Sequence, residues 1–213
     1  MTAYTIGVDE AGRGASLGPL VVVAAAIPHI YEEELVRLGI KDSKQFTGDS
    51  RNRFQSRERK FYQMVELLGS NFFADCRASA ALVDSYVSPK DKTIDELERR
   101  LAAEAVSQVK AQTGGDPEKI IFDSHNIFHN ITLDVKGEII AENKADEKYV
   151  AVSAASVVAK YMRDKAVREL MGDSFWKGGG YPNMYTARWV RANSQSTSIR
   201  RSWSWFKKLK IEK

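Results

Sequence analysis

The sequence predicts a mixed α/β domain followed by a small helical extension. Strand-like apolar runs alternate with long helical patterns along most of the chain. Hydrophobic residues make up 43% of the 213 residues, which is enough for one sizeable core. No repeat, low-complexity tract or proline-rich linker interrupts the pattern. We therefore expect one main domain over residues 1–171 and a basic helical extension over residues 172–213.

The first half of the chain predicts three strands and two helices. The segment TAYTIGVD favours a first strand, and the valine-rich run GPLVVVAAAI at 18–27 favours a second. Because glycine-rich sequence separates these two runs, we expect a hairpin. A charged helical stretch at about 49–68, a short strand at about 71–79 and a strong helical pattern at about 96–112 follow.

The second half predicts two more strands and a long helix. The run EKIIFDS favours a strand that ends at Asp123, and GEIIAENKAD favours a strand that leads to Asp146. A long helix at about 149–170 contains many small residues. A GGGYP break then precedes one or two short helices that are rich in basic and aromatic residues.

Composition also predicts the setting in which the chain works. The sequence has no run of about 18 apolar residues that would favour a membrane span, and its N-terminus lacks the pattern of a secretory signal. A single cysteine, Cys76, fits a reducing compartment and is expected in the core. We expect a cytoplasmic protein that acts as a monomer and does not bind membranes.

Charge is distributed unevenly along the chain. Residues 160–213 contain 13 Lys and Arg against 4 Asp and Glu, a net charge of +9. Residues 1–159 contain 19 against 24, a net charge of −5. A basic C-terminal quarter beside an acidic body suits a polyanion that is bound near a carboxylate centre. A basic tail that is merely solvated is the alternative.

The glycines that follow the first strand do not form a nucleotide-binding turn. Such a turn opens a helix whose N-terminus holds the pyrophosphate. Here Pro19 and a β-branched run follow, which favour a strand. We expect instead that Gly12 and Gly14 let the backbone approach a bulky ligand, with Arg13 beside it.

Acidic residues stand at the ends of three predicted elements. Asp9 and Glu10 end the first strand, Asp123 ends another, and Asp146 precedes the long helix. Individually, Asp123 fits a turn residue and Asp146 fits a helix N-cap. Together, four carboxylates at one sheet edge would need cations. Two Mg²⁺ or Mn²⁺ ions about 4 Å apart would meet that need and would suit attack on a phosphodiester.

These motifs together resemble the ribonuclease HII family, the type 2 ribonucleases H. The resemblance spans nearly the whole chain, and its motifs keep the family's order: GVDEAGRG, LGPLVVVAAAI, IKDSK, the FD strand end, ENKADEKY, SAASVVAK, GGGYP and RRSW. It implies a ribonuclease H-like α/β fold. It also implies cleavage of RNA in RNA–DNA duplexes, including single ribonucleotides embedded in DNA.

The resemblance implies a role for each candidate site residue. Asp9, Glu10, Asp123 and Asp146 match the family's metal-binding acids, with Asp9 expected to be shared by both ions. Gly12, Arg13 and Gly14 match an element that contacts the ribonucleotide 2′-OH and its phosphate. Tyr181 matches a tyrosine that packs beneath the junction and senses the same hydroxyl, which is the group that marks RNA. Ser43 and Lys44 match residues near substrate phosphates.

Other residues of the site region are assigned from chemistry alone. His125 and His129 are expected to be surface or core histidines and not ligands. The basic residues of the extension are expected to contact phosphates, while Trp189 and Trp203 pack the extension itself. The basic set comprises Lys177, Arg188, Arg191, Arg200 and Arg201.

Two alternatives remain open at this stage. Ribonuclease HIII shares the acidic core but usually has threonine where Arg13 stands and carries an additional N-terminal DNA-binding domain. A hybrid-binding module without activity would have no reason to keep four acids that repel phosphate. The sequence also lacks a Q-x-x-[LIM]-x-x-aromatic-aromatic segment, so recruitment by a sliding clamp is not expected.

Overall fold

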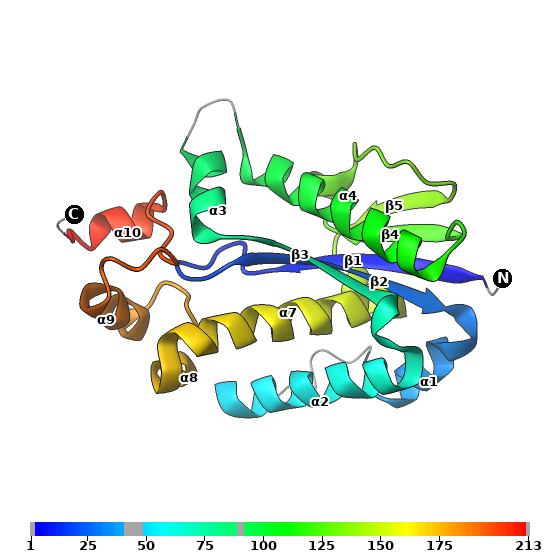
Figure 1. Cartoon of the computed structure of the whole chain (residues 1–213), viewed down its shortest axis with the longest axis horizontal. Coiled ribbons are helices and arrows are strands. Elements are labelled where there is room, and N and C mark those ends of the chain that lie inside the picture. Colours follow the sequence, from blue (N-terminus) through cyan, green and yellow to red (C-terminus); the bar gives the residue numbers. More distant parts are fainter. Residues whose placement is uncertain (1–2, 41–48, 89–91, 212–213) are drawn as a thin grey trace.

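A mixed sheet lies between two layers of helices in the computed structural model, which describes residues 3–40, 49–88 and 92–211 (Figure 1). The strands follow the order β3-β2-β1-β4-β5, with β1–β2 and β2–β3 antiparallel and β1–β4 and β4–β5 parallel. Their bounds are β1 Tyr4–Ala11, β2 Leu20–Pro28, β3 Phe73–Ala78, β4 Lys119–Asp123 and β5 Glu138–Glu142.

The helices fall into two layers and a terminal group (Figure 1). They are α1 Glu32–Arg37, α2 Ser50–Leu68, α3 Ala80–Val87, α4 Ile94–Thr113, α5 His125–Phe128, α6 Ala145–Lys148, α7 Val150–Met171, α8 Phe175–Gly178, α9 Met184–Ala192 and α10 Ser204–Lys208. The described residues also contain the 3₁₀ turns η1 His29–Tyr31, η3 Ser70–Phe72 and η4 Gly172–Ser174. In this described part, no helix has the length and apolarity needed to span a bilayer.

Strand β2 is buried on both faces, which explains its unbroken apolar sequence. Side chains alternate along a strand, so Val22 and Ala24 pack against α4 while Val21 and Val23 pack against α7. Central strands covered by helices on both faces lose the alternation of polar and apolar residues. The valine-rich run is therefore the centre of the molecule.

Helix α7 lies unusually close to β1, and Gly7 makes this approach possible. A Cβ atom placed at Gly7 would lie 2.1 Å from the backbone carbon of Ala151 and 2.2 Å from the nitrogen of Val152. No side chain fits in that space. The contact fixes the start of α7 against the middle of β1.

The C-terminal helices pack on the end of α7 and on α2 instead of standing apart. A separate apolar cluster joins Leu17, Phe54 and Tyr161 of the body to Phe175 and Val190 of α8 and α9. Leu17 also pairs with Ile199 in an isolated antiparallel bridge. The chain from residue 172 onward thus contributes to a core that it shares with the first domain.

The predicted strands and long helices are confirmed, while several short elements were not foreseen. The hairpin pairs Tyr4 with Pro28 through Ala11 with Val21, and Asp49 caps α2 by accepting from the backbone N–H of Asn52. The helices α1, α5 and α6 are only four to six residues long, too short for a clear apolar period, so their sequence carried little signal; the eight-residue α3 was also not foreseen. Cys76 is buried in the core as expected.

Replacing Gly7 with alanine should destabilise the fold by about 3 kcal/mol, because the methyl group must displace the α7 backbone. Urea unfolding followed by circular dichroism would measure the change. Gly14→Ala is the matched control, since a Cβ at Gly14 has no atom within 4 Å. Equal stability of the two variants would contradict this account of the contact between α7 and β1.

Candidate active site

Four of the predicted acids gather at one end of the sheet. Val8 pairs with Phe122 in the parallel β1–β4 ladder, so Asp9 and Asp123 are the next residues along two neighbouring strands. Asp123 accepts a 3.0 Å hydrogen bond from the backbone N–H of Ala145, which precedes Asp146. This bond brings the start of α6 to the strand ends. The ladder and one turn therefore bring Asp9, Glu10, Asp123 and Asp146 together.

These carboxylates are short of positive charge. Burial, followed by the charge of Glu10, raises the pKa of Asp9 well above its ordinary value. Burial, with Glu98 and Asp123 nearby, raises the pKa of Glu10 to about 7. Burial also raises the pKa of Asp123. A group of acids that resists ionisation is a site that a cation would stabilise.

The donor set suits a hard divalent cation. Every candidate ligand is a carboxylate oxygen, the type that Mg²⁺ and Mn²⁺ prefer. Among the described residues, however, no group of three or more His, Cys, Asp or Glu side chains is already arranged to hold a metal ion. The type of ligand therefore fits such a cation.

Ser156 and Lys160 of α7 also face these acids, and the sequence analysis did not assign them. Both lower the pKa of Asp9, Lys160 by its charge and Ser156 by a hydrogen bond. The Nζ of Lys160 donates to the Ser156 hydroxyl over 2.6 Å. Their spacing of four residues within SAASVVAK places them on one helix face, which is the signal that could have identified them.

The GRG loop, residues 12–14, follows the first two acids directly. Gly12 is buried with a φ of +92°, and a Cβ there would lie 2.7 Å from the carbonyl oxygen of Pro19. Gly12 is therefore required for an internal reason, and its contact with a ligand stays a prediction. Gly14 is exposed with open space around it, as a ligand contact requires.

Arg13 turns toward α4 and pairs there with two acids. Its guanidinium donates to Asp95 and to the fully buried Glu98. Burial raises the pKa of Glu98 to about 7, although Arg13 opposes this shift. The loop cation is thus anchored to α4, and its contact with a substrate phosphate stays a prediction.

Tyr181 lies on the surface beside the GRG loop and above a buried arginine. The guanidinium carbon of Arg163 lies 4.4 Å from the centre of the Tyr181 ring, whose residue is 43% exposed. The carbonyl of Gly180 accepts hydrogen bonds from the backbone N–H groups of Ser16, at 2.8 Å, and Leu17, at 3.1 Å. The structure therefore brings Tyr181 and the GRG loop together.

Five further predicted positions have different outcomes. Asp146 lies in the first turn of α6, and the N-cap of α7 is Tyr149, so the N-cap interpretation of Asp146 is wrong. His125 and His129 are exposed, with ring centres 5.3 Å apart, as expected of surface histidines. Ser43 and Lys44 lie outside the described residues.

The basic extension divides into exposed and buried cations. Lys177, Arg188 and Arg191 are exposed. Arg200, by contrast, is fully buried, so its predicted place on a phosphate-binding surface is wrong. Trp189 packs against the apolar cluster that the extension shares with the body, and Trp203 packs against the main core, so neither packs the extension alone.

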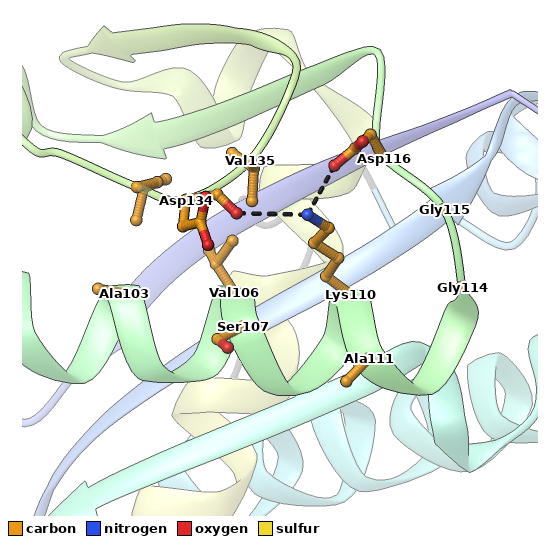
Figure 2. Close-up of a pocket in the computed structure, with 11 residues that line it drawn as sticks. Ala103, Val106, Ser107, Lys110, Ala111, Gly114, Gly115, Asp116, Asp134 and Val135 are labelled. Atoms are coloured by element: carbon orange, nitrogen blue, oxygen red, sulfur yellow. Dashed lines mark hydrogen bonds and ion pairs between the residues drawn. The ribbon is translucent and has the colours of Figure 1, made fainter.

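A separate hollow of about 490 Å³ lies at the other end of the sheet (Figure 2). Lys110 of α4 spans it and contacts Asp116 over 2.6 Å and the carbonyl of Asp134 over 3.3 Å. The Tyr4 hydroxyl bonds the neighbouring Gly115 carbonyl, which places the hollow beside the start of β1. The acids follow the end of the same strand, so this hollow is not part of the carboxylate site.

Comparisons with known proteins identify the family. The model of the family "Ribonuclease HII" matches residues 6–206. A ribonuclease HII of Thermococcus onnurineus is 32% identical over 216 residues, which cover 95% of this chain and 88% of that protein. A ribonuclease HII of Methanobrevibacter smithii is 30% identical over 218 residues, covering 96% and 97%.

Solved structures agree with the fold. The crystal structure of the ribonuclease H2 from Pyrococcus horikoshii OT3 aligns with a TM-score of 0.80 and 30% identity, over 97% of this chain and 96% of that one. A Bst-RNase HIII in complex with Mn²⁺ aligns with a TM-score of 0.78 at 21% identity, over 98% of this chain and 69% of that one, and supports the fold alone.

One comparison bears on the expected absence of a clamp partner. A PCNA:RNase HII complex from Archaeoglobus fulgidus aligns with a TM-score of 0.73 and 27% identity, over 98% of both chains. The prediction that a sliding clamp plays no part is therefore not supported. The family match, the curated relatives and the acid cluster agree: this chain belongs to the ribonuclease HII family, the type 2 ribonucleases H, hydrolases that cleave the RNA strand of RNA–DNA hybrids.

Proposed function

We propose that the chain also cuts duplex DNA at a single embedded ribonucleotide, on its 5′ side, leaving 3′-hydroxyl and 5′-phosphate ends. One observation carries this proposal: the GRG loop and Tyr181 lie side by side next to the acids, joined by the bonds from Ser16 and Leu17 to the Gly180 carbonyl. A single ribonucleotide differs from its neighbours by one hydroxyl, so its recognition requires fixed groups close to the scissile phosphate.

Different residues of the chain would recognise the ribonucleotide and stabilise the ionised acids. Gly14 leaves room for the sugar, Tyr181 offers an exposed ring and hydroxyl, and Arg13 offers a cation at the loop. Lys160 stabilises the ionised form of Asp9 and Asp123. None of these groups needs to act as a general base if the metals activate the water.

The acids would bind Mg²⁺ or Mn²⁺, and their raised pKa values support this assignment. Asp9 would be shared by two ions, with Glu10 and Asp123 completing one site and Asp146 the other. Bound ions would supply an activated water and stabilise the leaving 3′-oxygen. The Mn²⁺ in the structure of Bst-RNase HIII is consistent with such chemistry on this fold.

A labelled DNA duplex with one ribonucleotide should be cut once in the presence of Mg²⁺ or Mn²⁺, because the GRG loop and Tyr181 select the 2′-OH. Denaturing gels would map the cut, and ligation of the products would identify their ends. Cleavage of long hybrids alone would contradict the proposal. No cleavage of either duplex would favour a binding module without activity.

Asp146→Asn should reduce cleavage by roughly two or more orders of magnitude, a typical loss for an electrostatic catalytic group. Folding should be unaffected, since Asp146 does not cap α7. Initial rates at saturating and limiting Mg²⁺ and thermal unfolding would test both expectations. Glu147→Gln, the same change in charge one residue away, should retain activity. Near-full activity of Asp146→Asn at limiting Mg²⁺ would overturn the assignment.

The exposed cations of the extension should contact phosphates. A triple substitution of Lys177, Arg188 and Arg191 to glutamine should lower the slope of log affinity against log salt by roughly 0.9 for each lost contact. The cut position should not change, because phosphate contacts carry no base information. A matched triple substitution of Arg37, Lys119 and Lys136, outside the extension, should leave the slope as it is. If the triple substitution of Lys177, Arg188 and Arg191 leaves the salt slope unchanged, these cations are merely solvated and do not contact phosphates.

A further inference from the structure

Two arginines buried beneath the GRG loop have no role in the proposed chemistry. Arg163 of α7 is 1% exposed, and Arg200 is fully buried. Burial, followed by the charge of Arg163, lowers the pKa of Arg200 to about 10, so the two cations lie close enough to repel. Buried like charges are costly unless their surroundings compensate for them. Their contacts show what they do.

Arg200 holds the GRG loop by its carbonyl groups. Its Nη1 donates to the carbonyls of Gly12, at 2.7 Å, and Arg13, at 3.0 Å, and its Nε donates to that of Gly18 over 3.2 Å. The backbone N–H of Arg200 donates in turn to the Ser16 carbonyl. One planar guanidinium therefore joins the GRG loop to Gly18, just before β2, which a lysine ammonium cannot do with the same geometry.

Arg163 joins this loop to Tyr181. Its Cγ lies 3.1 Å from the Cβ position of Gly12, and its guanidinium lies beneath the Tyr181 ring at 4.4 Å. Asp164 pairs with its Nη1 over 2.8 Å. A cation under an aromatic face is held most strongly when both are shielded from water.

We propose that Arg163 and Arg200 are positioning residues that hold the GRG loop and Tyr181 as one rigid unit, and thereby set the preference for a ribonucleotide over a deoxyribonucleotide. This inference rests on the proposed function, because it assigns 2′-OH recognition to those two elements. Both arginines act through other groups, since neither reaches the surface. A displacement of about 1 Å of the GRG loop or Tyr181 would be enough to break a hydrogen bond to the 2′-OH.

The test compares the affinity for a duplex with one ribonucleotide with the affinity for the same duplex made only of DNA. Binding is measured in Ca²⁺ by fluorescence anisotropy, with gels that confirm intact duplexes. Arg163→Lys and Arg200→Lys keep the charge and lose the planar group. Each should lower the ratio of the two affinities by about fivefold or more, while the affinity for all-DNA duplex changes by less than about twofold.

Arg168→Lys is the matched control, because Arg168 is on the same helix and also lies over aromatic rings, 5.1 Å from those of Phe54 and Trp176. It should leave the ratio unchanged. The double variant Arg163→Lys/Tyr181→Ala should have the same affinity ratio as Tyr181→Ala alone, since Arg163 acts through Tyr181. If thermal unfolding shows that Arg200→Lys does not fold, the test relies on Arg163→Lys and on the double variant Arg163→Lys/Tyr181→Ala.

Three results would overturn the inference. An unchanged ratio in Arg163→Lys would show that the arginine does not position the recognition elements. An equal loss of affinity for both duplexes would show general damage or a lost phosphate contact. A wild-type protein that does not prefer the ribonucleotide would refute the proposed function itself, and the inference with it.

Discussion

The contact between α7 and β1 at Gly7 determines where the residues of α7 lie along the site. Helix α7 presents one face along β1 and the loop that follows it. Successive residues on this face are Ala151 and Val152 at Gly7, Ser156 and Lys160 at the acids, Arg163 under Gly12, and Val167 against Gly18 and Gly180. Four helical residues rise about 6 Å and two strand residues about 6.6 Å, so the two elements stay in step. One close packing contact thus sets the spacing of the catalytic and recognition groups.

Charge in this region is arranged in layers. The acids lie at the strand ends with raised pKa values, and Lys160 faces them from α7. Beneath the loop lie two buried arginines, Arg163 farther along α7 and Arg200 from the segment between α9 and α10. Lys160 and the buried arginines compensate only part of the negative charge of the acids. The site therefore favours ligands that bring both signs, such as a divalent cation together with a phosphodiester.

The sequence predicted what depends on local pattern and missed what depends on pairing across the chain. The apolar runs identified the strands, and the strand-end acids identified the acid cluster, because both signals are local. Arg200 was expected on the surface, since nothing near it in sequence reveals three loop carbonyls from residues 12 to 18. Glu98 was not singled out in the sequence, because nothing near it reveals that it is buried and paired with Arg13. Asp146 was assigned an N-cap because the short α6 could not be told from the start of α7.

The bridge from Leu17 to Ile199 and the bonds of Arg200 have a consequence for biosynthesis. The loop that follows the first strand is completed by residues more than 180 positions later, as in the bond between residues 12 and 200. Domains form during synthesis from the N-terminus, at about 5–20 residues per second. The sheet and α7 are made before Arg200 leaves the ribosome, so the nascent chain carries its acids for several seconds without an ordered loop. These bonds can order the GRG loop only after residue 200 has been synthesised.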